Sequence, residues 1–366
     1  MKKILLVIGT RPEAIKMCPL LPALSDVGLS PVLCVSGQHG ALLWEALSLF
    51  SVTPAYDLGL SRRAGEGLSS FAGGVMSALG SVLAEEKPDL VLVHGDTLTA
   101  LAAAEGAFLS RIPVGHVEAG LRTGDLSAPF PEEHARVQID HFASYLFAPT
   151  EAAKQNLLRE GRAESDILVS GNTGVDAMRL FHRPAFSHPV LDFARERRLL
   201  LLTLHRRESQ GEPMRAMLRA VRRICEAFSD VCVFFPCHPN PAVRSIAEEE
   251  LGGAPRVLLS DATDALTFQN VLARAYLVLT DSGGVQEEAP YFGVPVLVLR
   301  ERTERVEGVS AGVLRVVGTG EEGIVSAATQ LLSDESAYRQ MARARTPFGD
   351  GYAAVRIAHF LRERLA

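Results

Sequence analysis

The sequence predicts an α/β protein made of two doubly wound domains, each with a parallel sheet covered by helices. A chain of 366 residues exceeds one ordinary core, and short apolar runs alternate with longer helical patterns throughout. The two halves also open alike, with an apolar strand and then a basic turn, 9–11 in one and 205–207 in the other. We therefore expect a first domain over 1–180, a second over 195–350 that faces it across a cleft, and a C-terminal helix over 351–366 that returns to the first domain.

In the first half, runs rich in β-branched residues and leucine predict strands, and apolar residues at helical spacing predict the helices between them. The expected strands are Lys3–Ile8, Pro31–Ser36, Leu90–Val93, Pro113–His116, Tyr145–Ala148 and Ile167–Ser170. The expected helices are Pro12–Leu24, Gly40–Phe50, Leu68–Glu85, Thr99–Ser110 and Glu151–Arg159.

The segment Phe181–Leu191 interrupts this rhythm with two prolines and predicts a linker. A second series of strands then follows: Arg198–Thr203, Val231–Phe235, Arg256–Leu259, Tyr276–Thr280, Pro295–Leu299 and Leu314–Val317. Its expected helices are Met214–Phe228, Ala242–Leu251, Leu266–Ala275, Val285–Phe292, Glu322–Leu332 and Ala353–Leu365.

Composition excludes several classes of partner. A net charge of −6 gives no reason to expect nucleic acid or an anionic membrane, and no apolar run is expected to reach the roughly 20 residues of a membrane helix. Five cysteines without a CxxC pair signal neither a zinc site nor a disulfide framework. We expect a soluble, cytoplasmic protein with reduced thiols, no metal and no cofactor.

Two glycine-containing turns are candidate anion sites, because each lies between a predicted strand and a predicted helix. Asp281-Ser282-Gly283-Gly284 could bring backbone N–H groups to a diphosphate, although ordinary helix capping explains it equally well. Gly9–Glu13 places Arg11 and Lys16 near a strand end, where they could bind phosphate or remain solvated. A GxGxxG opening and a Walker-type GxxxxGK[ST] motif are both absent from the sequence.

Acidic residues also follow strands of the first half. Asp96 and Glu118 come after predicted strands, and Glu132 lies at a helix start; each alone could be a cap or a dipole-matching residue. Together they could crowd carboxylates into one pocket, raise the pKa of at least one of them and supply a general acid or base. In the second half, His205 and His238 follow neighbouring strands and point to an anion or nucleotide site.

Ten short motifs in this order resemble the non-hydrolysing UDP-N-acetylglucosamine 2-epimerases over essentially the whole chain. They are GTRPEAIK (9–16), GQH (37–39), HGDT (94–97), GHVEAGLRT (115–123), PFPEE (129–133), GNT (171–173), HRRE (205–208), HPNP (238–241), the stretch 280–290 and TER (303–305). The string PFGDG (347–351) near the end belongs to the same resemblance.

The resemblance implies a GT-B-like pair of Rossmann-like domains, a homodimer, and reversible epimerisation at sugar C2 by elimination and re-addition of UDP through a 2-acetamidoglucal. Carried over position by position, the acid/base residues are Asp96, Glu118 and Glu132, with His205 as the leaving-group partner. The implied UDP or substrate contacts are Arg11, Lys16, Arg136, His238, Ser282, Gly283, Gly284 and Glu288.

The sequence departs from the family pattern at several positions. Ala135 stands where the family usually has Asn, Gly174 interrupts an apolar pair, and Val306 replaces a Pro. Bacterial members often bind a second substrate molecule as an activator through a Gln-His pair, matched here by Gln38 and His39. Glu66 stands where they use Gln, and an acid there would repel a diphosphate, so we expect weak activation or none.

Three other functions fit parts of the sequence. The same chemistry on a related UDP-sugar, such as a 2,3-diacetamido-glucuronic acid nucleotide, would preserve all the UDP motifs. A GT-B glycosyltransferase would share the diphosphate site, and a nucleotide-sugar binding protein would need no catalysis. The three carboxylates Asp96, Glu118 and Glu132 favour the epimerase, because neither a transferase nor a binding protein abstracts a proton at C2.

Overall fold

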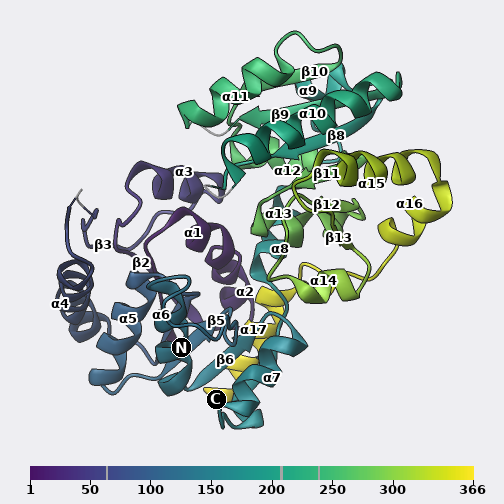
Figure 1. Cartoon of the computed structure of the whole chain (residues 1–366). Helices are drawn as coiled ribbons and strands as arrows, with labels where there is room; N and C mark the ends of the chain where they lie inside the picture. Colours follow the sequence, from purple (N-terminus) through teal and green to yellow (C-terminus); the bar gives the residue numbers. More distant parts are fainter. Residues whose placement is uncertain (63–64, 207–208, 238–239) are drawn as a thin grey trace. The chain divides into compact units, whose positions relative to one another are not determined.

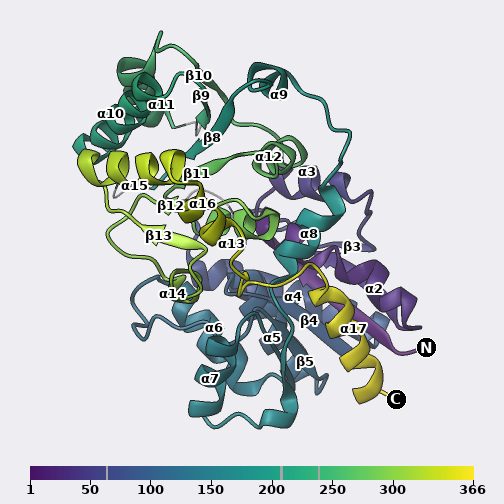
Figure 2. The same ribbon diagram turned by 90° about the vertical axis from the view of Figure 1, so that its right-hand side faces the viewer.

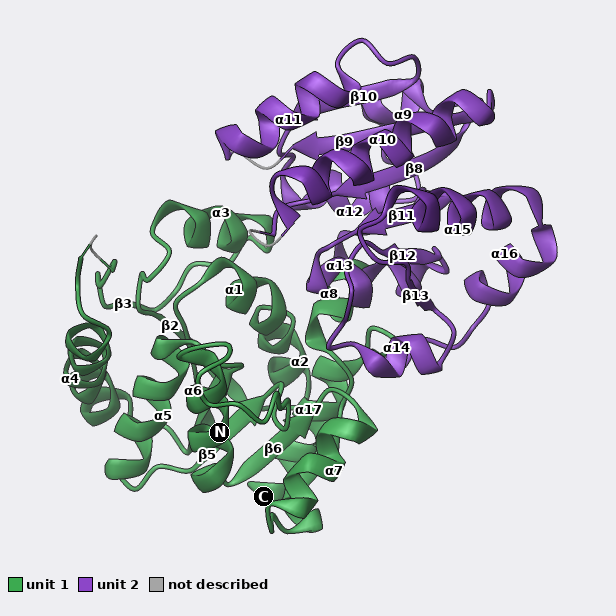
Figure 3. Cartoon of the chain, viewed as in Figure 1, with its two compact units in different colours: residues 1–179, 348–366 green, residues 180–347 purple. Residues whose placement is uncertain are grey.

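The computed structural model describes residues 1–62, 65–206, 209–237 and 240–366. The chain forms two compact units, one made of Met1–Arg179 with Phe348–Ala366 and the other of Leu180–Pro347 (Figures 1 and 3). The chain therefore crosses from one unit to the other twice, after Arg179 and after Pro347.

The described residues of unit 1 form a seven-stranded parallel sheet with the order β3-β2-β1-β4-β5-β6-β7. Its strands are β1 (Lys3–Ile8), β2 (Ser30–Val35), β3 (Tyr56–Asp57), β4 (Leu90–His94), β5 (Val114–Val117), β6 (Tyr145–Ala148) and β7 (Ile167–Val169). The strand order reverses between β1 and β4. In doubly wound sheets, ligands bind at the carboxyl ends of the strands beside such a reversal.

Helices cover both faces of this sheet. They are α1 (Arg11–Met17), α2 (Leu20–Asp26), α3 (Ala41–Leu49), α4 (Leu68–Glu86), α5 (Leu98–Leu109), α6 (Glu132–Phe142), α7 (Glu151–Arg159), α8 (Thr173–Phe181) and α17 (Ala353–Arg364), with a 3₁₀ turn, η1, at Glu164–Asp166. Alternate side chains of β1 enter the two cores, since successive residues of a strand point to opposite faces. Ile4 and Leu6 pack with α1, α2 and α17, whereas Leu5 and Val7 pack with α4 and α5.

The C-terminal helix α17 belongs to unit 1. Its Ala354, Ile357 and Leu361 are buried in the same core cluster as Ile4, and the helix packs against α2 (Figure 2). The last residues of the sequence thus complete one face of the first sheet.

Helix α4 is long and apolar enough to cross a membrane by length and composition. The expectation that no run would reach this length is therefore wrong for Leu68–Glu86. The core helix of a globular domain passes the same test, and Leu79, Val82 and Leu83 of α4 lie in the core cluster of β4 and β5.

The described residues of unit 2 form a six-stranded parallel sheet with the order β10-β9-β8-β11-β12-β13. Its strands are β8 (Arg198–Thr203), β9 (Val231–Cys237), β10 (Val257–Asp261), β11 (Leu277–Thr280), β12 (Val296–Val298) and β13 (Leu314–Val316). Its helices are α9 (Pro189–Phe193), α10 (Glu212–Ala227), α11 (Pro241–Leu251), α12 (Ala265–Leu272), α13 (Gly283–Glu288), α14 (Val306–Ser310), α15 (Glu321–Ser333) and α16 (Glu335–Ala342), with the 3₁₀ helix η3 (Ala289–Phe292). The strand order reverses between β8 and β11, which repeats the arrangement of unit 1.

Two parallel sheets with flanking helices confirm the predicted fold class, and local details differ for physical reasons. The expected helix Pro12–Leu24 is two helices, because Pro19 has no N–H to continue α1 and instead precedes α2. The expected linker Phe181–Leu191 contains the end of α8 and the start of α9. His188 caps α9 by accepting a hydrogen bond from the N–H of Val190 at 3.3 Å.

Candidate active site

The turn after β1 is organised by the buried carboxylate of Glu13. Its Oε2 accepts hydrogen bonds from the N–H of Gly9 (3.0 Å), the N–H of Thr10 (2.8 Å) and the hydroxyl of Thr10 (2.7 Å), and its Oε1 accepts one from the Thr97 hydroxyl (2.8 Å). This capping box therefore also ties the turn to the segment after β4. Burial raises the pKa of Glu13, although these hydrogen bonds act in the opposite direction. Gly9 is required here, since a Cβ would lie 2.3 Å from the Thr99 hydroxyl.

Helix α1 carries both cations predicted for this turn, but they have different surroundings. The guanidinium of Arg11 makes no hydrogen bond or ion pair with any residue in the described parts of the chain. Lys16, one turn further along α1, forms an ion pair with the carboxylate of Glu118. Arg11 is therefore available for an anionic ligand, whereas Lys16 already contacts a predicted catalytic residue.

Glu118 directly follows β5 and has an unusual backbone. Its φ of 68° lies in the left-handed region, which a residue with a side chain seldom adopts and which often marks a functional position. Nε2 of the buried His94 lies 3.5 Å from its carboxylate. Burial acts to raise the pKa of Glu118, but Lys16 and His94 outweigh it and hold that pKa well below its usual value. The pKa of Glu118 is thus lowered, whereas crowding of carboxylates was expected to raise the pKa of at least one of them.

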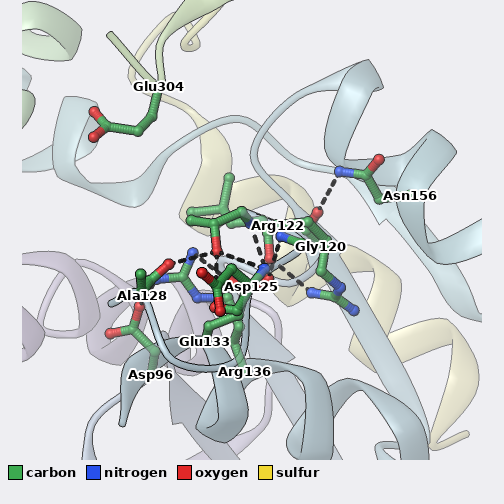
Figure 4. Close-up of polar contacts among 12 residues, drawn as sticks. Asp96, Gly120, Arg122, Asp125, Ala128, Glu133, Arg136, Asn156 and Glu304 are labelled. Atoms are coloured by element: carbon green, nitrogen blue, oxygen red, sulfur yellow. Dashed lines mark hydrogen bonds and ion pairs between the residues drawn. The ribbon is translucent and has the colours of Figure 1, made fainter. Parts of the chain in front are cut away.

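Asp96 follows β4 and pairs with Arg136 of α6 (Figure 4). Asp96 Oδ2 lies 2.5 Å from Arg136 Nη2, and Arg136 Nη1 lies 3.5 Å from Glu133 Oε2. The other oxygen of Glu133 accepts hydrogen bonds from the N–H groups of Thr123 (2.8 Å) and Gly124 (2.9 Å). Arg136, predicted as a substrate contact, is therefore in contact with a predicted catalytic carboxylate.

Glu132, the first residue of α6, has a buried Oε2 with no hydrogen-bond partner among the described residues. Buried carboxylate oxygens nearly always have a partner, so this atom is a candidate for contact with a ligand. Ala135, which replaces the family's usual Asn, is fully buried in the core cluster with Ile139.

The predicted activator pair lies beside the first turn. Gln38 Oε1 accepts a hydrogen bond from the Thr99 hydroxyl at 2.7 Å, and the backbone N–H of His39 donates to the Gly9 carbonyl at 3.0 Å. Partial burial lowers the pKa of His39. Glu66 lies in the segment before α4.

In unit 2, the buried Asp281 organises the strand ends beside the reversal of strand order. Its carboxylate accepts hydrogen bonds from the N–H groups of His205 and Arg206, both at 3.1 Å, and lies 3.1 Å from His205 Nδ1. Burial acts to raise the pKa of Asp281, but these contacts outweigh it and lower that pKa. The side chain of His205 remains 42% exposed.

The turn before α13 has an open helix start. Ser282 occupies the N-cap position, but its side chain makes no capping hydrogen bond, so the ordinary capping interpretation does not describe it. A Cβ on Gly283 would lie 3.0 Å from the guanidinium of Arg305, whose Nε donates to Glu287 at 2.7 Å. Gly284 and Glu288 complete this short helix. His238, predicted to bind UDP, lies outside the described residues.

Several residues around these sites received no role of their own from the sequence. His94, Glu133 and Asp281 lie within the recognised motifs, but nothing in the sequence shows which carboxylate or backbone group each contacts. Within the described ranges, no group of three or more His, Cys, Asp or Glu side chains could hold a metal ion.

Comparisons with known proteins agree with this arrangement. A model of the UDP-N-acetylglucosamine 2-epimerase family matches residues 23–362. The UDP-N-acetylglucosamine 2-epimerase of Bacillus subtilis is 46% identical over 360 residues, covering 98% of this chain and 94% of that protein. The enzyme of the same name from Escherichia coli K12 is 46% identical over 372 residues, covering 98% of each chain.

A solved structure of similar fold is the UDP-GlcNAc 2-epimerase of Neisseria meningitidis bound to UDP-GlcNAc. It is 37% identical, has a TM-score of 0.87, and the match covers 99% of this chain and 100% of that one. On the family match, the full-length identities and the shared fold, this chain belongs to the UDP-N-acetylglucosamine 2-epimerase family.

Proposed function

We propose that this chain interconverts UDP-N-acetylglucosamine and UDP-N-acetylmannosamine without net hydrolysis, by elimination and re-addition of UDP. The observation that carries the proposal is the pair of carboxylates, Asp96 and Glu118, at the carboxyl ends of the adjacent strands β4 and β5. Family membership and the relative bound to UDP-GlcNAc support the substrate.

The reaction needs one carboxylate on each face of sugar C2. A carboxylate takes the C2 proton, the electron pair of that C–H bond forms a C1=C2 double bond, and the C1–O bond breaks with its pair leaving on the β-phosphate of UDP. A second carboxyl group then protonates C2 from the opposite face as a UDP oxygen re-forms the bond to C1. Electrons and atoms balance without an oxidant or a cofactor.

We assign the acid/base roles to Asp96, Glu118 and Glu132. The ion pair with Lys16 keeps Glu118 ionised and ready to accept a proton, and the ion pair with Arg136 orients the carboxylate of Asp96. The buried oxygen of Glu132, which has no hydrogen-bond partner in the described parts of the chain, fits a group that contacts substrate.

UDP, as a leaving group, needs hydrogen-bond donors and cations around its phosphates. On the sequence resemblance we assign this role to Arg11, which has no partner among the described residues, to Ser282, Gly283 and Gly284, and to His238. Glu288 is assigned on the same resemblance as a contact to UDP. His205, oriented by Asp281, is the proposed leaving-group partner. Lys16 could serve both Glu118 and a phosphate.

Assembly, location and regulation follow from the same resemblance. We propose a homodimer, which sedimentation equilibrium tests. We also propose a cytoplasmic enzyme, since all five cysteines are buried free thiols, as a reducing compartment favours. Activation by a second substrate molecule at Gln38 and His39 is expected to be weak, because of Glu66.

Proton NMR of the chain with UDP-N-acetylglucosamine in deuterium oxide tests the function. Loss of the C2 proton signal with appearance of the manno epimer is the expected result. Free N-acetylmannosamine and UDP would instead reveal a hydrolysing enzyme. An unchanged spectrum would contradict the proposed substrate and direct the search to another UDP-sugar or to a glycosyl acceptor.

Amide variants test the residue assignments separately. Asp96→Asn, Glu118→Gln and Glu132→Gln are each expected to bind UDP as the parent does but to lose turnover. Normal turnover in any one of them would remove that residue from the acid/base set.

A further inference from the structure

Beyond the acid/base residues themselves, His116 and Asp140 connect the two segments that carry them. His116 is a central residue of β5 and is fully buried, and Asp140, in the last turn of α6, is 1% exposed. His116 Nδ1 lies 2.6 Å from Asp140 Oδ1, and His116 Nε2 lies 2.7 Å from the carbonyl oxygen of Gly95. The Gly95 carbonyl can only accept, so Nε2 of His116 donates to it, and Nδ1 shares a hydrogen bond with the Asp140 carboxyl group.

On one side, this pair holds the residue that precedes Asp96. Gly95 has a φ of +65°, donates its N–H to the Val117 carbonyl at 2.9 Å, and accepts the His116 hydrogen bond at its own carbonyl. Both backbone polar groups of Gly95 are therefore fixed by β5. The direction in which the chain leaves Gly95 sets the position of Asp96.

On the other side, the same pair holds the segment that follows Glu118. Asp140 Oδ2 accepts hydrogen bonds from the Gly120 N–H at 2.9 Å and from Arg122 Nη1 at 2.8 Å. Asn156 donates to the Gly120 carbonyl at 3.0 Å (Figure 4). Gly120 cannot carry a side chain, because a Cβ would lie 2.3 Å from the Ala153 carbonyl.

We propose that His116 and Asp140 are positioning residues that fix the spacing between the carboxylates of Asp96 and Glu118. The hydrogen bond from His116 holds Gly95, the residue before Asp96, and the one accepted by Asp140 holds Gly120, two residues after Glu118. A reaction that removes a proton from one face of C2 and returns one to the other depends on this spacing. The inference rests on the epimerase activity proposed above.

A merely structural role is the competing explanation, because buried ion pairs often serve the fold alone. Two variants of the same residue separate these roles. In His116→Asn, the amide nitrogen takes the place of Nδ1 and keeps the contact with Asp140 but loses Gly95. In His116→Gln, the amide nitrogen takes the place of Nε2 and keeps Gly95 but loses Asp140. Both variants remove the imidazole, so a structural defect would affect them alike.

The assay follows UDP-N-acetylglucosamine in deuterium oxide and compares deuterium in the recovered gluco substrate with formation of the manno epimer. Active enzyme is counted by UDP titration, and melting temperatures are recorded. We expect His116→Asn to lose about 100-fold in kcat per UDP site with little change in KM, the size expected for a misplacement of about 1 Å. Its ratio of deuterium exchange to inversion should rise, because the carboxylate on one face of C2 can still exchange the proton, whereas the carboxylate on the other face is misaligned. His116→Gln should remain within about tenfold of the parent in kcat, with a smaller rise in the ratio than His116→Asn, because it keeps Gly95 in place and breaks only the link to Asp140.

Equal kcat in the two variants, or an unchanged ratio in His116→Asn, would overturn the inference. An inactive parent enzyme in the same spectrum would instead contradict the proposed function. If both variants fail to fold, Arg122→Met tests the same idea, because it removes the hydrogen bond from Arg122 Nη1 to Asp140. Glu160→Gln is its control, since Glu160 contacts Nε and Nη2 of Arg122 and not the nitrogen that binds Asp140. A raised ratio in Arg122→Met alone supports the spacing role, and parental ratios in both overturn it.

Discussion

Lys16 of α1 and Glu118, which follows β5, form an ion pair between residues that are 102 positions apart in the sequence. The pair lies where the sheet of unit 1 reverses its strand order, and it joins a predicted phosphate contact to a predicted proton acceptor. The charge of Lys16 therefore lowers the pKa of Glu118 even in the absence of a ligand.

Replacing Lys16 with Gln should raise the pKa of Glu118. Burial acts to raise this pKa, and Lys16 is the largest of the effects that oppose it. A proton acceptor works only above its pKa, so the acid limb of the kcat/KM profile should move to higher pH in Lys16→Gln. The pH profile of epimerisation measures this shift. Lys16→Arg keeps the positive charge and is the control, and coincident acid limbs in Lys16→Gln and the parent would contradict the prediction.

Replacing Arg136 with Met should lower kcat by about 100-fold, because Asp96 loses the guanidinium that orients it at 2.5 Å. The loss should fall on kcat more than on KM if Arg136 acts through Asp96, and on KM if it contacts substrate directly. Arg136→Lys should recover part of the activity with one remaining charged contact. Glu133→Gln is the control. Its amide oxygen can still accept the hydrogen bonds from Thr123 and Gly124, and the variant removes only the negative charge that faces Arg136.

The positions of the acid/base candidates could be predicted because they depend on strand order alone. Asp96 and Glu118 each follow a buried apolar run, and the carboxyl ends of parallel strands meet at one edge of a sheet. Their partners could not be predicted in the same way. Arg136 lies 40 residues beyond Asp96 on a different element, and helical periodicity does not show which face of α6 points to that carboxylate.

In the fold as well, some features could be predicted from local sequence patterns and others could not. The other described strands were visible as apolar runs, whereas β3 has two residues, which is too short for any periodicity. The break after α1 depends on Pro19 and was visible in principle. The side chain of Asp176 accepts hydrogen bonds from the first N–H groups of α17. This long-range cap was not visible, since no local pattern links Asp176 to the start of α17.

Replacing Asp176 with Ala should destabilise the chain by about 1–3 kcal/mol, because two buried backbone N–H groups would lose their acceptor. Asp176 accepts from Ala353 at 3.1 Å and Ala354 at 2.9 Å, and α17 has no cap of its own. Urea unfolding measures the loss. Asp350→Asn breaks only an exposed pair with Arg356 and should cost at most about 1 kcal/mol. Equal losses in the two variants would show that the long-range cap contributes nothing special.

Replacing Glu66 with Gln should make the rate curve more sigmoidal. The parent enzyme is expected to follow a hyperbolic curve without a lag, because the carboxylate at this position repels the diphosphate of a second substrate molecule. Initial rates over a range of UDP-N-acetylglucosamine concentrations measure the change. Glu45→Gln removes the same charge from the exposed side of α3 and should leave the curve unchanged. Strong sigmoidality in the parent would contradict this account of Glu66.

Replacing Glu13 with Gln should change how stability depends on pH. Burial raises the pKa of Glu13 above its ordinary value of 4.5, so above that pH the folded chain holds a proton that the unfolded chain has lost. The contribution of Glu13 to the free energy of unfolding therefore declines as pH rises from 4.5 through the folded pKa. Gln accepts the same hydrogen bonds from Gly9 and Thr10 but cannot ionise, so it lacks this decline. The melting temperature of Glu13→Gln relative to the parent should rise across this window, whereas the exposed Glu335→Gln should follow the parent at every pH. Parallel melting curves for Glu13→Gln and the parent would mean that the buried carboxylate is equally ionised in both states, and that the turn after β1 carries no charge penalty.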